Sequence, residues 1–187
     1  MRIITGKARG AKLETLEGEL TRPTSERTKE AVFSMLQFDI QGKAVLDLFA
    51  GSGQIGLEAL SRGAQCAYMV DRSKLAIDVI KRNIAKTRLE GGAFTFCEDS
   101  LLFLKRYSGD AFDIVFLDPP YATDLIGETL KILSERGLLK STSKVICESD
   151  RFEILDTENS KNYEIIKAMK HGVAHVTVLK VRDAEEI

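Results

Sequence analysis

Short apolar runs of β character alternate with helical patterns along most of this 187-residue chain. Parallel strands need long crossovers, usually helices, so the alternation favours a mainly parallel sheet covered by helices on both faces. Near the end, only Lys170-His171-Gly172-Val173 separates two such runs, which leaves no room for a helix and predicts an antiparallel hairpin. The fold class is therefore α/β and doubly wound. The expected strands are 44–49, 67–70, 93–97, 112–117, 144–148, 163–169 and 174–181, and the expected helices are 55–62, 73–88, 101–106 and 125–136.

The first 40 residues have a different character and predict an extension made of a hairpin and a helix. Arg2–Thr5 and Lys12–Thr15 favour a small hairpin around Arg9-Gly10. Residues 25–38 have helical periodicity. The expected apolar side of this helix consists of Ala31, Val32, Met35 and Leu36. The length of the chain suits a single domain, 1–187, on which residues 1–40 pack as an N-terminal extension.

The composition predicts an ordinary globular protein of the cytoplasm. Hydrophobic residues make up 44% and charged residues 29%, and no apolar run approaches the roughly 20 residues of a membrane helix. The N-terminus lacks the apolar region of a signal peptide. Cys66, Cys97 and Cys147 lie far apart and are expected to be buried free thiols. With only two histidines in the chain, no metal site is expected.

The charge distribution leaves room for a local interaction with nucleic acid. A formal net charge of −1 gives no global attraction. The stretch from Met1 to Lys12, however, carries four cations and no acid. Such a segment can bind phosphates, and it can equally be a solvated surface.

A glycine-rich segment follows the first expected strand and opens the first expected crossover helix. Gly51, Gly53 and Gly56 have the spacing G-x-G-x-x-G, and Asp71 ends the next strand. Such glycines let the backbone approach a ligand closely, while an acid at that position accepts hydrogen bonds from ribose hydroxyls. The pattern predicts an adenosine-bearing ligand. It does not separate NAD from other cofactors of that kind.

Two acids weigh against NAD. Asp47 lies in an otherwise apolar strand, where a buried carboxylate needs a partner such as the ammonium of a methionine moiety. Asp118-Pro119-Pro120-Tyr121 ends the apolar run 112–117, and two prolines force the chain out of the strand. The carboxyl ends of parallel strands share one edge, so the glycines and Asp118 are expected to face one site. A plain turn with a buried tyrosine is the alternative reading of these four residues.

With these residues in view, the chain resembles S-adenosylmethionine-dependent methyltransferases with a D/N-P-P-Y motif, which methylate exocyclic amines of nucleobases. More narrowly, it resembles the bacterial 16S rRNA guanine-N2 methyltransferases (the RsmD-like family), whose class I fold is Rossmann-like. The pattern departs from the family at Asp71, where Glu is commoner, and at Gln54-Ile55, where a small apolar pair is commoner. The motifs that carry the resemblance are Met1 to Gly6, Arg9-Gly10, Thr21-Arg22-Pro23-Thr24, Asp47 to Gly53, Gly56 to Ala64 and Asp118 to Tyr121.

The resemblance implies S-adenosyl-L-methionine as cofactor and 16S rRNA, or a small-subunit particle, as substrate, with no obligate protein partner. Asp118 and the carbonyl of Pro119 would accept hydrogen bonds from the target amine, and Tyr121 would stack on the base beside Pro120. The implied cofactor residues are Asp47, Phe49, Gly51, Ser52, Gly53, Asp71, Arg72, Asp99 and Ser100. The candidates for phosphate contacts are Arg2, Lys7, Arg9, Arg22 and Arg27.

Three other functions share parts of this pattern. A DNA adenine-N6 methyltransferase uses the same amine chemistry but usually carries a target-recognition region, for which core elements leave no room here. An NAD-dependent oxidoreductase explains the glycine spacing but not Asp118 to Tyr121. A nucleic-acid-binding module that merely keeps the fold would not need the intact cofactor and proline motifs.

Overall fold

The computed structural model describes residues 1–16, 26–120, 123–151, 153–172 and 174–182. The chain divides into two compact units, Met1–Asp99 and Ser100–Ile187. Each unit carries its own strands and helices.

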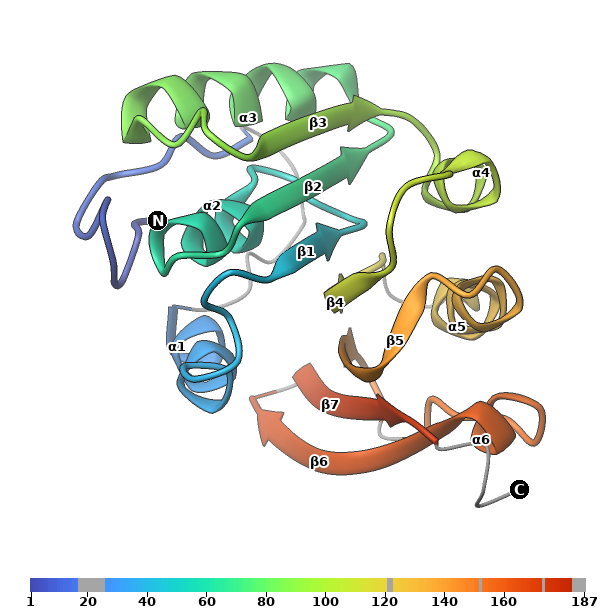
Figure 1. The fold of residues 1–187 in the computed structure, drawn as a ribbon. Coiled ribbons are helices and arrows are strands. Elements are labelled where there is room, and N and C mark those ends of the chain that lie inside the picture. The colour runs from blue at the N-terminus through green and yellow to red at the C-terminus, as the bar shows by residue number, and fades with distance from the viewer. Residues whose placement is uncertain (17–25, 121–122, 152, 173, 183–187) are drawn as a thin grey trace. The chain divides into compact units, whose positions relative to one another are not determined.

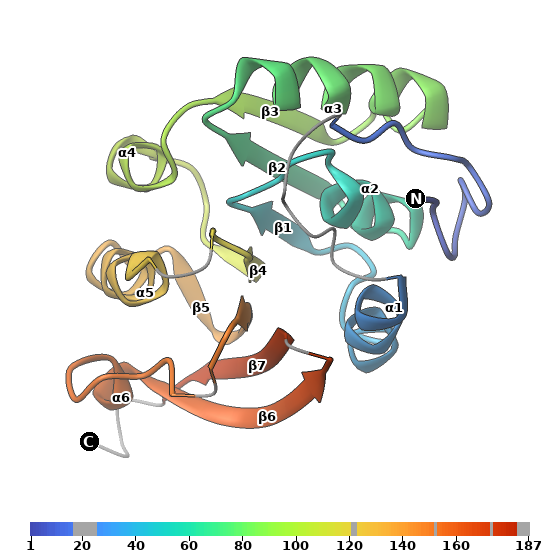
Figure 2. The ribbon, with the colours of Figure 1, turned by 180° about the vertical axis from the view of Figure 1, so that it is seen from behind.

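The first unit contains three parallel strands in the order β3-β2-β1. Helices α2 and α3 pack against the same face of these strands (Figures 1 and 2). Val45, Met69 and Val70 have no exposed surface, as expected for strands covered by helices. The elements are α1 (Glu26–Met35), β1 (Ala44–Asp47), α2 (Gln54–Ser61), β2 (Cys66–Asp71), α3 (Lys74–Thr87) and β3 (Ala93–Cys97).

Helix α3 begins and ends as its sequence predicts. The Ser73 hydroxyl accepts a hydrogen bond from the Ala76 N–H at 3.3 Å and so caps the first turn. Ile77, Ile80 and Ile84 recur at helical spacing and are buried. The helix ends at Arg88, whose φ of 56° turns the chain out of the helical path.

The N-terminal part of this unit contains the expected hairpin, but its helix differs from the prediction. Arg2 pairs antiparallel with Lys12, and further backbone hydrogen bonds join the two strands on either side of this bridge. Val32 of α1 and Leu36, which directly follows the helix, are buried as expected, but α1 also buries Phe33 and the entire side chain of Lys29. The buried side of the helix is therefore rotated relative to the predicted one. The prediction used hydrophobicity alone and so excluded Lys29, which is charged.

The second unit contains four strands in the order β4-β5-β7-β6. Strand β5 pairs parallel to β4 and antiparallel to β7, and β6 and β7 form the expected antiparallel hairpin. The elements are α4 (Ser100–Arg106), β4 (Phe112–Leu117), α5 (Leu125–Glu135), β5 (Leu139–Ser149), α6 (Asn159–Asn162), β6 (Tyr163–His171) and β7 (Ala174–Val181).

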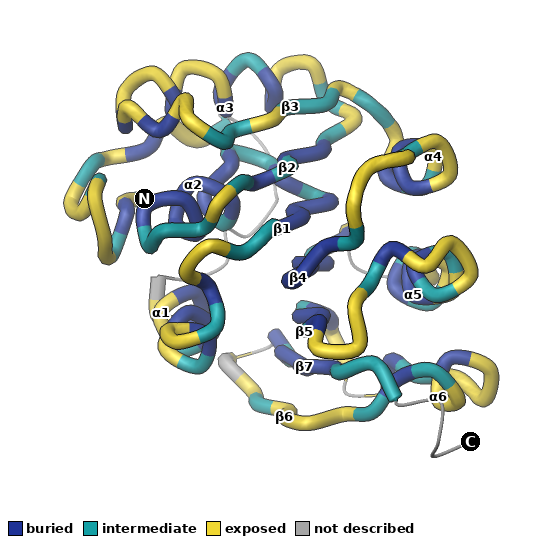
Figure 3. The backbone as a smooth tube through the Cα atoms, in the orientation of Figure 1, coloured by how far each residue is buried: buried dark blue, intermediate teal, exposed yellow. Residues whose placement is uncertain are grey.

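The predicted fold class is confirmed: the seven-stranded sheet is mainly parallel and ends in an antiparallel hairpin. Figure 3 shows buried backbone along β4 and exposed backbone on the outer turns of α3. All six residues of β4 are buried. In the part of the chain that the structure describes, no helix is long and apolar enough to cross a membrane.

The cysteines are only partly as expected. Cys147 is buried, and burial raises the pKa of its thiol. Cys66 is half-buried, and Cys97 is exposed, which corrects the expectation that all three are buried. Strand β3, which carries Cys97, lies at the end of the strand order, where a strand has a neighbour on one side only.

Candidate active site

The glycine loop joins β1 to α2 and is held from several sides. The Ala50 N–H donates to the Val70 carbonyl at 3.0 Å, and the Gly51 N–H donates to Asp71 Oδ2 at 2.8 Å. Gly53 has a φ of 76°, and a Cβ atom there would lie 3.1 Å from Ile80. Only glycine suits this position on both counts. At Gly51 the Cβ direction is open to at least 4 Å, so one side of the loop admits a ligand.

Asp71 fastens this loop to the start of α3. One carboxylate oxygen accepts from the Gly51 N–H and the other from the Ser73 N–H, both at 2.8 Å. A carboxylate has about four acceptor positions, so these two bonds leave capacity for further donors. The residue that was expected to bind ribose thus also shapes the loop.

Asp47 is a carboxylate of the core with unusual protonation. It is 3% exposed, and its Oδ2 accepts from the Gly56 N–H at 3.2 Å. Burial raises its pKa to about 7, and the nearby charge of Asp71 adds to this, while hydrogen bonds from the backbone of Gly56 and Phe49 oppose it. Backbone groups thus supply part of the partner that the sequence led us to expect from a ligand.

The remaining cofactor candidates differ in exposure. Phe49 and Ser52 are half-buried, whereas Arg72 is exposed. Asp99 is exposed and follows β3 by two residues, because the strand ends at Cys97, as the sequence predicted. Ser100 is buried and begins α4.

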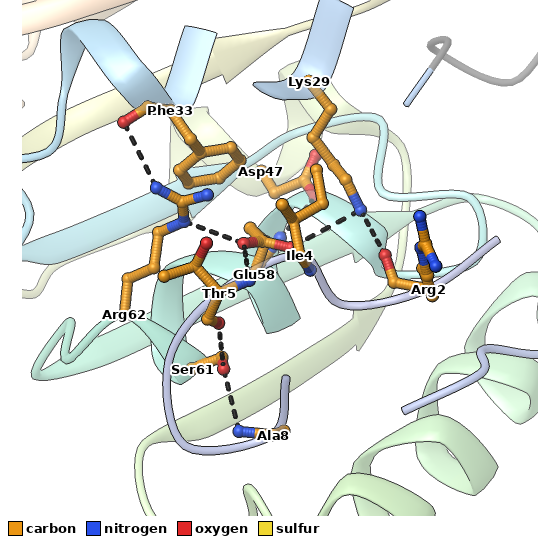
Figure 4. A network of polar contacts seen from close by, with 11 residues as sticks. Arg2, Ile4, Thr5, Ala8, Lys29, Phe33, Asp47, Glu58, Ser61 and Arg62 are labelled. Atoms are coloured by element: carbon orange, nitrogen blue, oxygen red, sulfur yellow. Dashed lines mark hydrogen bonds and ion pairs between the residues drawn. The ribbon is translucent and has the colours of Figure 1, made fainter. Parts of the chain in front are cut away.

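A buried carboxylate in α2 holds the N-terminal segment in place (Figure 4). Glu58 has no exposed surface and accepts from the N–H groups of Ile4 at 2.7 Å and Thr5 at 3.1 Å. Two cations flank it: Arg62 Nε at 2.7 Å and Lys29 Nζ at 3.5 Å. Four donors around one carboxylate compensate the cost of burying the charge.

One turn further along α2, Ser61 makes a second attachment. Its hydroxyl donates to the Thr5 carbonyl at 2.6 Å and accepts from the Ala8 N–H at 3.0 Å. The Ser61 carbonyl accepts from the Lys7 N–H at 2.8 Å. Residues 3–8 therefore follow a defined path along α2.

The sequence did not identify Lys29 and Glu58 as a pair. The sequence predicted no role for Lys29, and Glu58 stood only within the motif Gly56 to Ala64. A signal was present, because Lys29 lies at helical spacing from the apolar residues Val32, Phe33 and Leu36.

Three of the basic candidates for RNA contact, Arg2, Lys7 and Arg9, belong to this N-terminal segment. Arg2, Lys7, Arg9 and Arg27 are exposed, whereas Arg22 lies outside the described residues. The backbone of Arg2 is also anchored, because its carbonyl accepts from Lys29 Nζ at 2.8 Å.

In the second unit, the Asp-Pro-Pro motif follows the last residue of β4. Asp118 is half-buried, Pro119 is buried and Pro120 is exposed; Tyr121 lies outside the described residues. Thr123 closes the turn by donating a hydrogen bond from its hydroxyl to the Pro120 carbonyl at 2.8 Å.

A pocket of about 300 Å³ opens beside the two prolines. Residues from two parts of the unit line it: the loop with the start of α5, and the end of β5 with the segment that follows. These residues are Pro119, Pro120, Thr123, Asp124, Ile126, Gly127, Glu148, Ser149, Asp150, Arg151 and Ile154. None of the last five was a candidate from the sequence, since only the pairing of β5 beside β4 brings them to the proline motif. Among the residues that the structure describes, no group of three or more His, Cys, Asp or Glu is placed to hold a metal ion.

The fold and these motifs define a class I methyltransferase that uses S-adenosyl-L-methionine. The chain belongs to the family described as Conserved hypothetical protein 95, whose model matches residues 1–180. The small-subunit ribosomal RNA methyltransferase D of Haemophilus influenzae is 35% identical over 92% of this chain and 90% of its own. YlbH of Bacillus subtilis, described as a candidate rRNA methyltransferase, is 34% identical over 97% of this chain and 100% of its own. The solved structure of yhhF from Escherichia coli, a candidate methyltransferase, superposes with a TM-score of 0.87 at 32% identity and covers 97% of this chain and 98% of its own.

Proposed function

We propose that this protein transfers a methyl group from S-adenosyl-L-methionine to N2 of a guanine in 16S rRNA. The observation that carries the proposal is the pocket beside Pro119 and Pro120, which follow Asp118, the first residue after β4. The names of the relatives support an rRNA substrate. They do not specify the base or the atom.

The amine chemistry gives the acid and the prolines their roles. An exocyclic amine is a weak nucleophile, because its lone pair is delocalised into the ring. Asp118 and the carbonyl of Pro119 each accept a hydrogen bond from the amine and orient its lone pair toward the methyl group. Tyr121 and Pro120 lie against the face of the base, which has left its stack. Most of the rate gain then comes from positioning and electrostatics.

The acids of the pocket favour guanine over adenine. Asp124, Glu148 and Asp150 line it. The pairing edge of guanine presents two adjacent donors, N1–H and the N2 amine, which suit a carboxylate acceptor. Adenine presents a lone pair at N1, which a carboxylate repels. A volume of about 300 Å³ is large enough for one nucleobase.

The glycine loop fits the proposed cofactor. S-adenosylmethionine supplies a methyl group made electrophilic by its positive sulfur. Gly51 leaves open space for a ligand, and Gln54 Oε1 is buried without a hydrogen-bond partner among the described residues, so it can accept from a donor. Asp71 accepts from the ribose hydroxyls, and Asp47 lies toward the ammonium group. Phe49, Ser52, Gly53, Arg72, Asp99 and Ser100 complete the proposed contacts.

The exposed cations of the N-terminal segment supply phosphate contacts. Glu58 and Ser61 anchor the backbone of the segment that carries Lys7 and Arg9. The two side chains therefore start from fixed positions when they contact the phosphates of folded RNA. Arg2, Arg22 and Arg27 are the other proposed contacts. A substrate of this kind places the enzyme in the cytoplasm.

The test is methyl transfer from labelled S-adenosylmethionine to purified 16S rRNA, to small-subunit particles and to duplex DNA. We expect label in RNA or particles, recovered after digestion as N2-methylguanosine. Label in DNA as N6-methyladenine would establish the alternative amine reaction. No transfer to any of the three, with binding of NAD instead, would refute a methyltransferase.

A further inference from the structure

Asn83 joins the N-terminal segment to the glycine loop. This residue of α3 has no exposed surface. Its Oδ1 accepts from the Glu14 N–H at 2.8 Å. Its Nδ2 donates to the Glu14 carbonyl at 3.0 Å and to the Ser52 carbonyl at 2.9 Å. One rigid amide therefore connects two segments that are 38 residues apart (52 − 14).

The two partners belong to different parts of the proposed function. Glu14 lies near the end of the segment that carries Lys7 and Arg9 and that is anchored to α2 at its other end. Ser52 lies between Gly51 and Gly53 of the cofactor loop. Since the Ser52 carbonyl accepts from Asn83, the orientation of the peptide bond between Ser52 and Gly53 depends on the Asn83 side chain. The N–H of that peptide bond in turn donates to the Ala50 carbonyl at 2.6 Å.

We propose that Asn83 is a positioning residue through which RNA bound to the N-terminal segment and S-adenosylmethionine bound to the glycine loop influence each other's affinity. This inference rests on the proposed function of the two segments. A shift of Glu14 on RNA binding moves the two hydrogen bonds between Glu14 and the Asn83 amide. The bond from Asn83 to the Ser52 carbonyl then transmits this shift to the glycine loop. By thermodynamic linkage, the cofactor changes RNA affinity by the same factor.

The neighbouring residue provides a matched control. Arg82 Nε contacts the Glu14 carboxylate at 2.8 Å in an exposed ion pair, whereas Asn83 contacts the Glu14 backbone. Exposed pairs of this kind contribute little to stability. Arg82→Ala therefore disturbs Glu14 without disturbing the amide bridge.

The experiment measures S-adenosylmethionine binding by equilibrium dialysis, with and without saturating 16S rRNA. For the wild type we expect RNA to change cofactor affinity about fivefold or more. Asn83→Ala should weaken cofactor binding without RNA by about tenfold and reduce the effect of RNA to less than about twofold. Arg82→Ala should behave as the wild type.

A second variant separates the two sides of the bridge. Glu14→Pro removes the N–H that donates to Asn83 Oδ1 but leaves the bonds from Asn83 Nδ2 to the carbonyls of residues 14 and 52. Cofactor binding without RNA should therefore stay normal, while the effect of RNA is reduced. If Asn83→Ala does not fold, as circular dichroism will show, Glu14→Pro decides alone. An RNA effect of wild-type size in Glu14→Pro, or no RNA effect in the wild type, overturns the inference. A wild type that binds neither S-adenosylmethionine nor RNA refutes the proposed function instead.

Discussion

Asp47 is a single carboxylate whose charge can follow cofactor binding. Its pKa of about 7 in the folded protein lies well above its ordinary value of 3.8, because burial disfavours the charged form. Its effect on stability has a definite sign. Protonation of Asp47 stabilises the folded state, because the folded state binds the proton more tightly than the unfolded state does. This stabilisation is fully present below pH 3.8 and is lost as the pH rises to about 7.

Cofactor binding should therefore depend on pH through Asp47. If the ammonium of S-adenosylmethionine lies nearby, it favours the charged carboxylate, so affinity should rise with pH up to about 7 and then level off. Below the pKa, the slope should approach about tenfold per pH unit. Calorimetry across this range tests the expectation. Asp47→Asn should remove the slope, and a variant that keeps it would assign the proton to another group.

Asp118 is expected to act on the acceptor and not on the cofactor. Asp118→Ala should lower kcat by at least about a hundredfold while calorimetry shows nearly unchanged S-adenosylmethionine binding. Asp118→Asn is the matched variant, because it keeps one acceptor oxygen but loses the negative charge and the ability to take a proton. Methylation at the wild-type rate by Asp118→Ala would refute the role.

Gly6 and Gly10 differ in what a substitution by alanine would cost: strain from a positive φ at both, and a steric clash of the added Cβ at Gly6 alone. Both have positive φ, 90° and 82°. A Cβ at Gly6 would also lie 1.8 Å from the Ser61 carbonyl oxygen, whereas at Gly10 it meets nothing within 4 Å. Gly10→Ala should lower the free energy of unfolding by about 1 kcal/mol and Gly6→Ala by about 3 kcal/mol or more. Urea unfolding measures both, and equal losses would mean that residues 5–8 do not lie against α2 in solution.

At the level of helices and strands, local pattern predicted most of the elements and missed those that depend on distant partners. The apolar runs identified β1 to β4, and Ser73 marked the start of α3. The first half of β5 was missed, because Lys140-Ser141-Thr142-Ser143 is polar. It forms a strand because Phe112 pairs with Leu139 and the Ser143 hydroxyl donates to the Phe112 carbonyl at 2.6 Å. The short helix α6 was also missed.

The candidate site divides in the same way. The glycines, Asp47, Asp71 and the Asp-Pro-Pro motif are visible in the sequence because each motif is contiguous with a strand end. The sequence does not reveal the roles of Asn83, Lys29 or the residues after β5, because their partners are far away along the chain.

The attachment of the N-terminal segment to α2 depends on Glu58. Glu58→Ala should cost about 3–5 kcal/mol, since it removes two backbone contacts and leaves the buried Lys29 without this partner. The segment should then be cut faster by trypsin at Lys7 or Arg9. Denaturant midpoints and digestion rates give the two readouts.

Lys74→Ala is the matched control for Glu58→Ala, because it breaks an exposed pair with Asp78 at 3.5 Å and should change stability by less than about 0.5 kcal/mol. A Glu58→Ala protein with normal stability and normal digestion would contradict the role of Glu58 in attaching the N-terminal segment to α2.

At the scale of the whole molecule, residues 1–180 match one family model and the relatives align across nearly all of the chain. We therefore propose that residues 1–187 behave as one methyltransferase domain. Calorimetry should show a single cooperative unfolding transition, with equal calorimetric and van't Hoff enthalpies. S-adenosylmethionine should raise its Tm, because it binds the folded state. Two separate transitions, of which the cofactor shifts only one, would mean that Met1–Asp99 and Ser100–Ile187 unfold independently.

The bonds from Asp71 to Gly51 and Ser73 have a consequence for turnover. They tie the glycine loop to the protein's own groups, so we expect little ordering entropy to be lost when the cofactor enters. The same loop receives the demethylated product, which keeps the ribose and the amino acid portion on which the proposed contacts depend. A loop that is ready for both molecules discriminates weakly between them. The enzyme should therefore be inhibited by its own product, and its rate should follow the ratio of methylated to demethylated cofactor.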